Sequence, residues 1–170
     1  MWEKIAIGVI LGVAVYTDLT YRKIFNWLTL PTAVAGVCVS VPKGIGEVGN
    51  HLFGMGVGVF VLLPFFLLGM GRGLGGGDVK LMGVVGAWVG FPNILSALFY
   101  TALWGGVVSL GTALYKGRLQ ESLKRTLEMI RAFYIPGMKI EGALPSDPLH
   151  VPYGVAILLG TLCAFWVPVL

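Results

Sequence analysis

Apolar residues run along the chain in six long blocks, separated by shorter polar stretches. The blocks cover residues 2–19, 27–41, 52–70, 79–91, 94–115 and 151–170. About 20 apolar residues suffice to carry a helix across the ~30 Å hydrocarbon core of a bilayer; the fourth block is short for this and the second only just adequate. Because a segment in lipid must satisfy its backbone hydrogen bonds internally, each block predicts a helix. The pattern predicts an all-α polytopic integral membrane protein with about six transmembrane helices.

The composition agrees with this interpretation. Hydrophobic residues make up 56% of the chain and charged residues 12%, an unusual balance for a soluble domain. Six spans and their connections occupy the 170 residues, so we expect one membrane-embedded domain over residues 1–170, surrounded by lipid bilayer. The net charge of +4 could suit a nucleic-acid-binding protein, but the basic residues lie between the apolar blocks. This placement is typical of membrane topology, and no nucleic-acid partner is expected.

The distribution of basic residues predicts the orientation in the membrane. Ten of the twelve lie in or beside the first, third and fifth connections, and only Lys4 and Lys43 lie elsewhere. Since cytoplasmic loops carry an excess of Lys and Arg, we expect these three connections in the cytoplasm and both termini outside. The ten are Arg22, Lys23, Arg72, Lys80, Lys116, Arg118, Lys124, Arg125, Arg131 and Lys139.

The fifth connection, residues 116–150, is the only long one. Its apolar residues recur at steps of three and four, whereas most of its basic residues lie off that stripe. This spacing predicts one amphipathic helix on the inner leaflet, with its cations facing anionic headgroups. This helix could anchor the protein to lipid or contact a substrate, and both roles stay open. The apolar stripe consists of Leu119, Leu123, Leu127, Ile130 and Tyr134.

Two carboxylates lie at the ends of apolar blocks. Asp18 ends the first block, and Asp78 follows the glycine-rich stretch 71–77. An ionisable residue inside a membrane is by default a candidate functional residue. Simpler roles are also open: Asp18 could pair with Arg22 one helical turn away, and Asp78 could cap a helix that starts at Val79.

Two such carboxylates are the groups that aspartyl proteolysis requires. When two carboxyl groups lie a few ångströms apart, they share one proton, so one can act as a base and the other as an acid. The other acidic residues fall in connections or chain ends. No cluster of His, Cys and carboxylate residues has metal-ligand spacing, so no metal or cofactor is expected. We expect Cys38 and Cys163 to be buried, and His51 and His150 to lie in solvated connections.

Three motifs make the chain similar to the type IV prepilin peptidases, membrane aspartyl proteases of the GxGD class. Residues 75–78 fit Gly-x-Gly-Asp, and Lys80 and Leu81 continue it as Asp-x-Lys-Leu. Residues 86–90 read Gly-Ala-Trp-Val-Gly, matching a motif that follows at this distance. Near the last block, residues 152–154 read Pro-Tyr-Gly, similar to the family's Pro-aromatic-Gly.

The first aspartate also lies in a family-like setting. Family members read roughly Asp-x-x-x-x-x-Ile-Pro-Asn there, often with Arg four residues after the Asp. Asp18, Arg22, Ile24 and Asn26 match this pattern. Phe25 stands where proline is usual, and we expect this departure to alter the turn that leaves the helix.

The resemblance implies cleavage of the short basic leader from prepilin or pseudopilin-like precursors, at the cytoplasmic face of the inner (plasma) membrane. It implies Asp18 and Asp78 as the catalytic pair. Supporting roles are expected for Gly75 and Gly77, which could bring the loop close to an extended substrate. Further supporting roles are expected for Lys80, Arg22 and Asn26.

Many relatives of this kind also carry an N-terminal segment with paired CxxC motifs and an N-methyltransferase activity. The chain has neither the length nor the cysteines for such a segment, so we expect the short, peptidase-only form. Two alternatives stay open. One is a preflagellin-type peptidase of the same class, and the other is a small proton-coupled transporter that uses the aspartate pair as an ion site.

Overall fold

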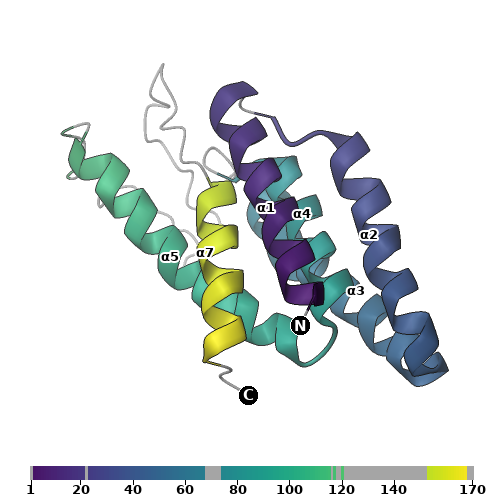
Figure 1. Cartoon of the computed structure of the whole chain (residues 1–170). Coiled ribbons are helices and arrows are strands. Elements are labelled where there is room, and N and C mark those ends of the chain that lie inside the picture. The colour runs from purple at the N-terminus through teal and green to yellow at the C-terminus, as the bar shows by residue number, and fades with distance from the viewer. Residues whose placement is uncertain are drawn as a thin grey trace.

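The described part of the chain is built from helices. The structure is a computed structural model that describes residues 2–21, 23–67, 74–115, 117, 120 and 153–167. Its helices are α1 (Trp2–Tyr21), α2 (Asn26–Ser40), the 3-10 helix η1 (Val41–Lys43), α3 (Ile45–Leu67), α4 (Gly76–Val89), α5 (Asn93–Tyr115) and α7 (Tyr153–Trp166) (Figure 1). Each of the six apolar blocks contains one α-helix, which confirms the all-α prediction for these residues. The amphipathic helix expected within 116–150 lies outside them.

Within the described ranges, three helices are long and apolar enough to cross a membrane, namely α1, α3 and α5. The helices α2, α4 and α7 are shorter, with 15, 14 and 14 described residues. Large apolar side chains, among them Ile5, Val9 and Phe60, are exposed on the outside of the bundle. Such a surface suits lipid tails, and the chain is a membrane protein in which six crossings remain a prediction.

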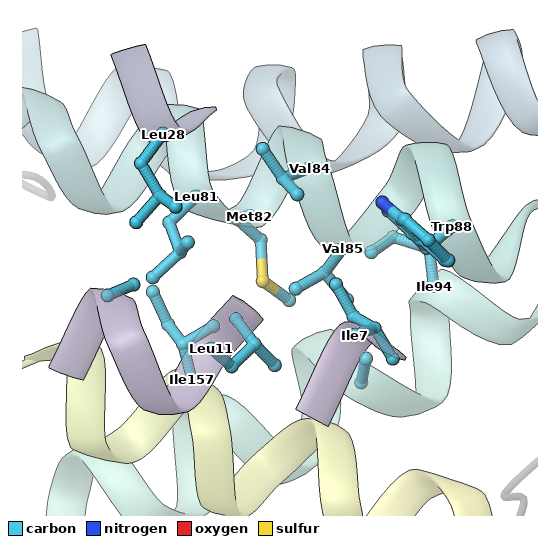
Figure 2. Packing of buried hydrophobic residues seen from close by; sticks show 12 residues of the cluster. Ile7, Leu11, Leu28, Leu81, Met82, Val84, Val85, Trp88, Ile94 and Ile157 are labelled. Carbon is cyan, nitrogen blue, oxygen red and sulfur yellow. The ribbon is translucent and has the colours of Figure 1, made fainter. Parts of the chain in front are cut away.

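Helix α4 lies at the centre of the bundle. Every residue from Leu81 to Trp88 is buried, so this helix is covered on all sides. A helix that is apolar all round belongs inside a bundle rather than at its surface. Figure 2 shows Met82 and Val85 of α4 among side chains of α1 and α7, including Leu11 and Ile157.

Glycines allow α3 to lie directly against α4. A Cβ atom on Gly86 would overlap the backbone at Gly54, and one on Gly58 would lie 2.5 Å from the Met82 carbonyl oxygen. Small residues let helices approach closely in lipid, where no hydrophobic force drives helices together. Gly54, Gly58 and Gly86 therefore let the two helix backbones meet directly.

Contacts at the N-terminal end of α1 fix the directions of α4 and α7 relative to it. At one end of α1, Trp2 packs edge-on against Trp88 of α4, and Lys4 donates a hydrogen bond to the Phe165 carbonyl oxygen of α7 (3.4 Å). Helices α4 and α7 therefore both run antiparallel to α1 (Figure 1). The C-terminal end of α1, with Asp18, consequently meets the N-terminal ends of α4 and α7. We call this end of the bundle the aspartate end.

Two predictions about single residues are wrong. His51 is not in a solvated connection but is buried in α3, which begins at Ile45, earlier than its apolar block indicates. Its Nδ1 lies 2.8 Å from the Ala87 carbonyl oxygen, a helix-end acceptor that has no partner within α4. Cys38 is exposed rather than buried, because a helix in lipid can present an apolar side chain outwards. His150 lies outside the described residues.

Candidate active site

Asp78 lies in the first turn of α4 and is buried, with 6% of its surface exposed. Its Oδ2 accepts a hydrogen bond from the backbone N–H of Gly75 (2.7 Å). The N-cap is Gly75, so Asp78 is the third helical residue and not the cap of a helix starting at Val79. The prediction was wrong in this detail because Gly76 and Gly77 adopt helical geometry. A carboxylate in a first helical turn is stabilised by the helix dipole.

Asp18 lies in the last turn of α1 and is also buried, with 8% of its surface exposed. It is close enough to Asp78 for the two negative charges to repel each other. The structure thus brings together two carboxylates that are far apart in the sequence. Arg22, the other partner considered for Asp18, lies outside the described residues.

The connection between α1 and α2 packs against the start of α4. A Cβ atom on Gly77 would lie 2.9 Å from the Cβ of Ile24, so Gly77 leaves room for this connection. Lys80 donates a hydrogen bond to the Asn26 side-chain oxygen at 2.9 Å. Gly75 has more space, since its Cβ would make only ordinary contacts, with Asp78 Oδ2 at 3.5 Å and with the backbone nitrogen of Gly77 at 3.8 Å. These contacts place Gly77, Lys80 and Asn26 beside the N-terminal end of α4, the helix that carries Asp78, while contact with a substrate stays a prediction.

Phe25 takes the backbone conformation of a proline. It is the N-cap of α2 with φ −78° and ψ 139°, and its carbonyl oxygen accepts the N–H groups of Leu28 and Thr29. Proline fixes φ near −65 ± 15°. The phenylalanine therefore keeps this torsion, contrary to the expected change in the turn.

Gly154 is a site neighbour that sequence reasoning did not select. It is buried in the first turn of α7, and a Cβ on it would lie 3.2 Å from Asp18 Oδ2. The signal was present, because Gly154 ends the Pro-Tyr-Gly motif. The sequence alone did not connect that motif with Asp18.

No group of three or more His, Cys, Asp and Glu residues that could hold a metal occurs in the described ranges. Among the described residues, the polar side chains at the aspartate end include the carboxylates of Asp18 and Asp78, the amide of Asn26 and the ammonium groups of Lys23 and Lys80. Such groups can exchange protons with water and bind a peptide backbone.

Fold and site together define a helical membrane protein with two buried, neighbouring carboxylates at one end of its bundle. The chain matches the Type IV leader peptidase family over residues 5–110, a stretch that includes both aspartates. It belongs to this family.

Curated relatives carry the name prepilin leader peptidase/N-methyltransferase. The relative from Aeromonas hydrophila is 28% identical over 109 residues, covering 62% of this chain and 38% of the relative. The Burkholderia pseudomallei (strain 1026b) relative is 32% identical over 102 residues (55% and 31%), and the Neisseria gonorrhoeae relative is 26% identical over 126 residues (69% and 44%). The matched part of the chain thus spans less than half the length of each of these relatives. No solved structure matches.

Proposed function

We propose that the protein is an aspartyl endopeptidase that removes the short basic leader of prepilin or pseudopilin-like precursors. The observation that carries this proposal is the approach of Asp18 to Asp78, two buried carboxylates that lie on different helices and are distant in the sequence. Membership of the Type IV leader peptidase family and the names of the relatives support the substrate class.

The proposed reaction uses one shared proton. Like charges in a poorly hydrated site do not both ionise, so one carboxyl group is protonated and the other is a carboxylate. The carboxylate takes a proton from water as the water oxygen forms a bond to the scissile carbonyl carbon. The protonated carboxyl group supplies a proton to the leaving amine when the C–N bond breaks. Asp18 and Asp78 thus perform both transfers together.

The site needs support to keep the two carboxyl groups at a working distance. Lys80, Asn26 and Gly77 tie the connection after α1 to the start of α4, so we assign them positioning roles. Gly75, which is exposed beside Asp78, is the glycine with space for an extended substrate. Arg22 keeps its proposed supporting role from the family motif.

The proposed location is the inner membrane, with six crossings and the aspartate end in the cytoplasm. Lys23 and Lys80 are exposed at the aspartate end, whereas Lys4 and Lys43 lie at the opposite end, where Lys43 pairs with Glu3 (2.8 Å). This asymmetry supports the orientation that the positive-inside rule predicts. Cysteine labelling at Ser122 from the cytoplasm and at Gly49 from outside tests it; labelling of Ser122 only from outside contradicts it.

The deciding experiment is co-expression with a leader-bearing type IV prepilin, followed by its mobility on a gel. The unchanged chain should shorten the precursor, whereas Asp18→Asn and Asp78→Asn should each leave it uncut at equal membrane abundance. Glu3→Gln is the matched control, since it removes a carboxylate from the far end of α1 and should keep cleavage. Processing by either Asn variant would remove that aspartate from the pair.

A further inference from the structure

The residue of α7 that lies next to the Asp18 carboxyl group is a glycine, Gly154, which has no side chain. Gly154 faces the carboxyl group there, and a Cβ atom on it would lie 3.2 Å from Oδ2, 3.6 Å from Cβ and 3.7 Å from Cγ of Asp18. The first of these distances is tighter than ordinary van der Waals contact. Any residue other than glycine at this position would press on the carboxyl oxygen itself.

Helix α7 is held in place by α5, so it has little freedom to retreat from such pressure. A Cβ on Gly160 would lie 2.5 Å from the backbone nitrogen of Thr101, which shows that the two helices touch at their backbones. Nearer to the site, the ring of Tyr153 packs against Gly105 of α5, where a Cβ would lie 3.2 Å from Cε1. Of the two sides of the contact, the Asp18 carboxyl group is the one that can turn.

The first turn of the α7 backbone also lies next to Asp18. Gly154 is the second residue of the helix as described, and the N–H groups of a first helical turn have no acceptors within the helix. The positive end of the helix dipole therefore lies beside the carboxylate. A side chain at position 154 would separate the two.

We propose that Gly154 is a positioning residue, whose missing side chain lets the Asp18 carboxylate lie against the first turn of α7 in the orientation that peptide hydrolysis requires. This assignment rests on the proposed peptidase function. It adds α7 to α1 and α4 as a helix that builds the site, although α7 lies outside the stretch matched by the family.

The first test is the activity of Gly154→Ala on a prepilin substrate, with purified enzyme. A small displacement of a reacting group can reduce the rate strongly, so kcat should fall about tenfold or more while KM stays unchanged. Gly12→Ala is the control, because a Cβ on this glycine of α1 would meet nothing within 4 Å. Unchanged kcat in Gly154→Ala would overturn the proposal.

The second test does not depend on activity. Gly154→Ala should lower the midpoint of thermal unfolding in the unchanged protein but not in an Asp18→Ala background, where Oδ2 and Cγ are gone. Such coupling between two substitutions identifies a direct contact. Equal losses in both backgrounds would overturn the proposal. If Gly154→Ala does not accumulate, abundance replaces the midpoint: recovery with Asp18→Ala supports the contact, and no recovery contradicts it.

The two proposals fail differently. If Asp18→Asn and Asp78→Asn both keep cleavage, the proposed peptidase mechanism fails, although the coupling of Gly154 to Asp18 in stability can still hold. If both Asn variants are inactive but Gly154→Ala is fully active, only the positioning role of Gly154 fails.

Discussion

The Lys80 ammonium group donates a hydrogen bond to the Asn26 side-chain oxygen at 2.9 Å, and this contact joins the N-terminal ends of α4 and α2. The two helices run parallel at this point, because Trp88 near the end of α4 also donates to the Thr32 carbonyl oxygen of α2. Asp78 lies two residues before Lys80. The contact therefore bears on where α4 places this aspartate.

Removal of this contact should reduce activity only moderately. Both side chains are exposed, and an ordinary hydrogen bond contributes about 0.5–1.5 kcal/mol. We expect Lys80→Met and Asn26→Ala each to lower kcat/KM by less than about tenfold, and the double variant to be no worse than either single one. Lys23→Met, an exposed lysine in the neighbouring connection, is the control. Strictly additive losses would show that the contact does not act as a unit.

Substitution of Gly77 should reduce activity more than substitution of Gly75. A Cβ at Gly77 would lie 2.9 Å from the Ile24 Cβ, whereas one at Gly75 would make only ordinary contacts, the nearest with Asp78 Oδ2 at 3.5 Å. Gly77→Ala should therefore displace the connection after α1 and lower cleavage at matched abundance. Gly83→Ala is unsuitable as a neutral comparison, because its Cβ would lie 2.7 Å from a methyl group of Val59. If Gly75→Ala lost more cleavage activity than Gly77→Ala, the expected order of the two glycines would be wrong.

His51 should matter for stability rather than for cleavage. Its ring donates to the Ala87 carbonyl oxygen near the end of α4, far from the aspartate end. His51→Ala leaves that buried acceptor without this partner, and we expect a loss of about 1–3 kcal/mol in the free energy of unfolding. Unfolding in detergent measures this loss. Per-molecule activity at low temperature should be near normal, and a strong loss of kcat in folded protein would contradict this separation of roles.

Proline should be accepted at position 25. Phe25 already has φ −78°, and proline reduces the freedom of the unfolded chain where the backbone fits. Phe25→Pro should keep activity and change stability by no more than about 1 kcal/mol. Thr29→Pro is the matched contrast, because it removes an N–H that donates to the Phe25 carbonyl oxygen and should cost about 3 kcal/mol. Loss of folded Phe25→Pro protein would show that the turn needs the aromatic ring.

Chelators should leave cleavage unchanged. The proposed chemistry uses only the proton shared by Asp18 and Asp78, with water as the nucleophile. Incubation with EDTA followed by the prepilin cleavage assay measures this. Loss of activity that returns with added metal would contradict the mechanism.

The sequence was most informative about helices and about the two aspartates. Apolar length predicts a helix in lipid whatever its neighbours are, so each of the six blocks contains one. Asp18 and Asp78 were recognisable because a carboxylate at the edge of an apolar block is costly without a function. Their approach depends on the antiparallel packing of α1 and α4, which the motifs indicated only through the family resemblance.

The sequence did not predict which side of each helix packs inside the bundle and which side is exposed. Lipid is as apolar as a protein interior, so hydrophobicity does not distinguish an outward Cys38 from an inward Met82. His51 was assigned to a connection because its surroundings are polar and glycine-rich, yet those glycines belong to the first turns of α3. The contact between Gly154 and Asp18 joins distant helices, and no local pattern reports it.

The backbone contact between α3 and α4 has a consequence for entropy. Side chains that are immobilised on packing lose rotamer freedom, and long ones lose up to about 2 kcal/mol each. Gly54, Gly58 and Gly86 have no rotamers to lose, so the backbone contacts at these three positions form without that penalty. The position of α4 relative to α3 is then independent of side-chain rearrangement at these points. Asp78 therefore lies at the N-terminal end of a helix whose position against α3 is determined by backbone contacts.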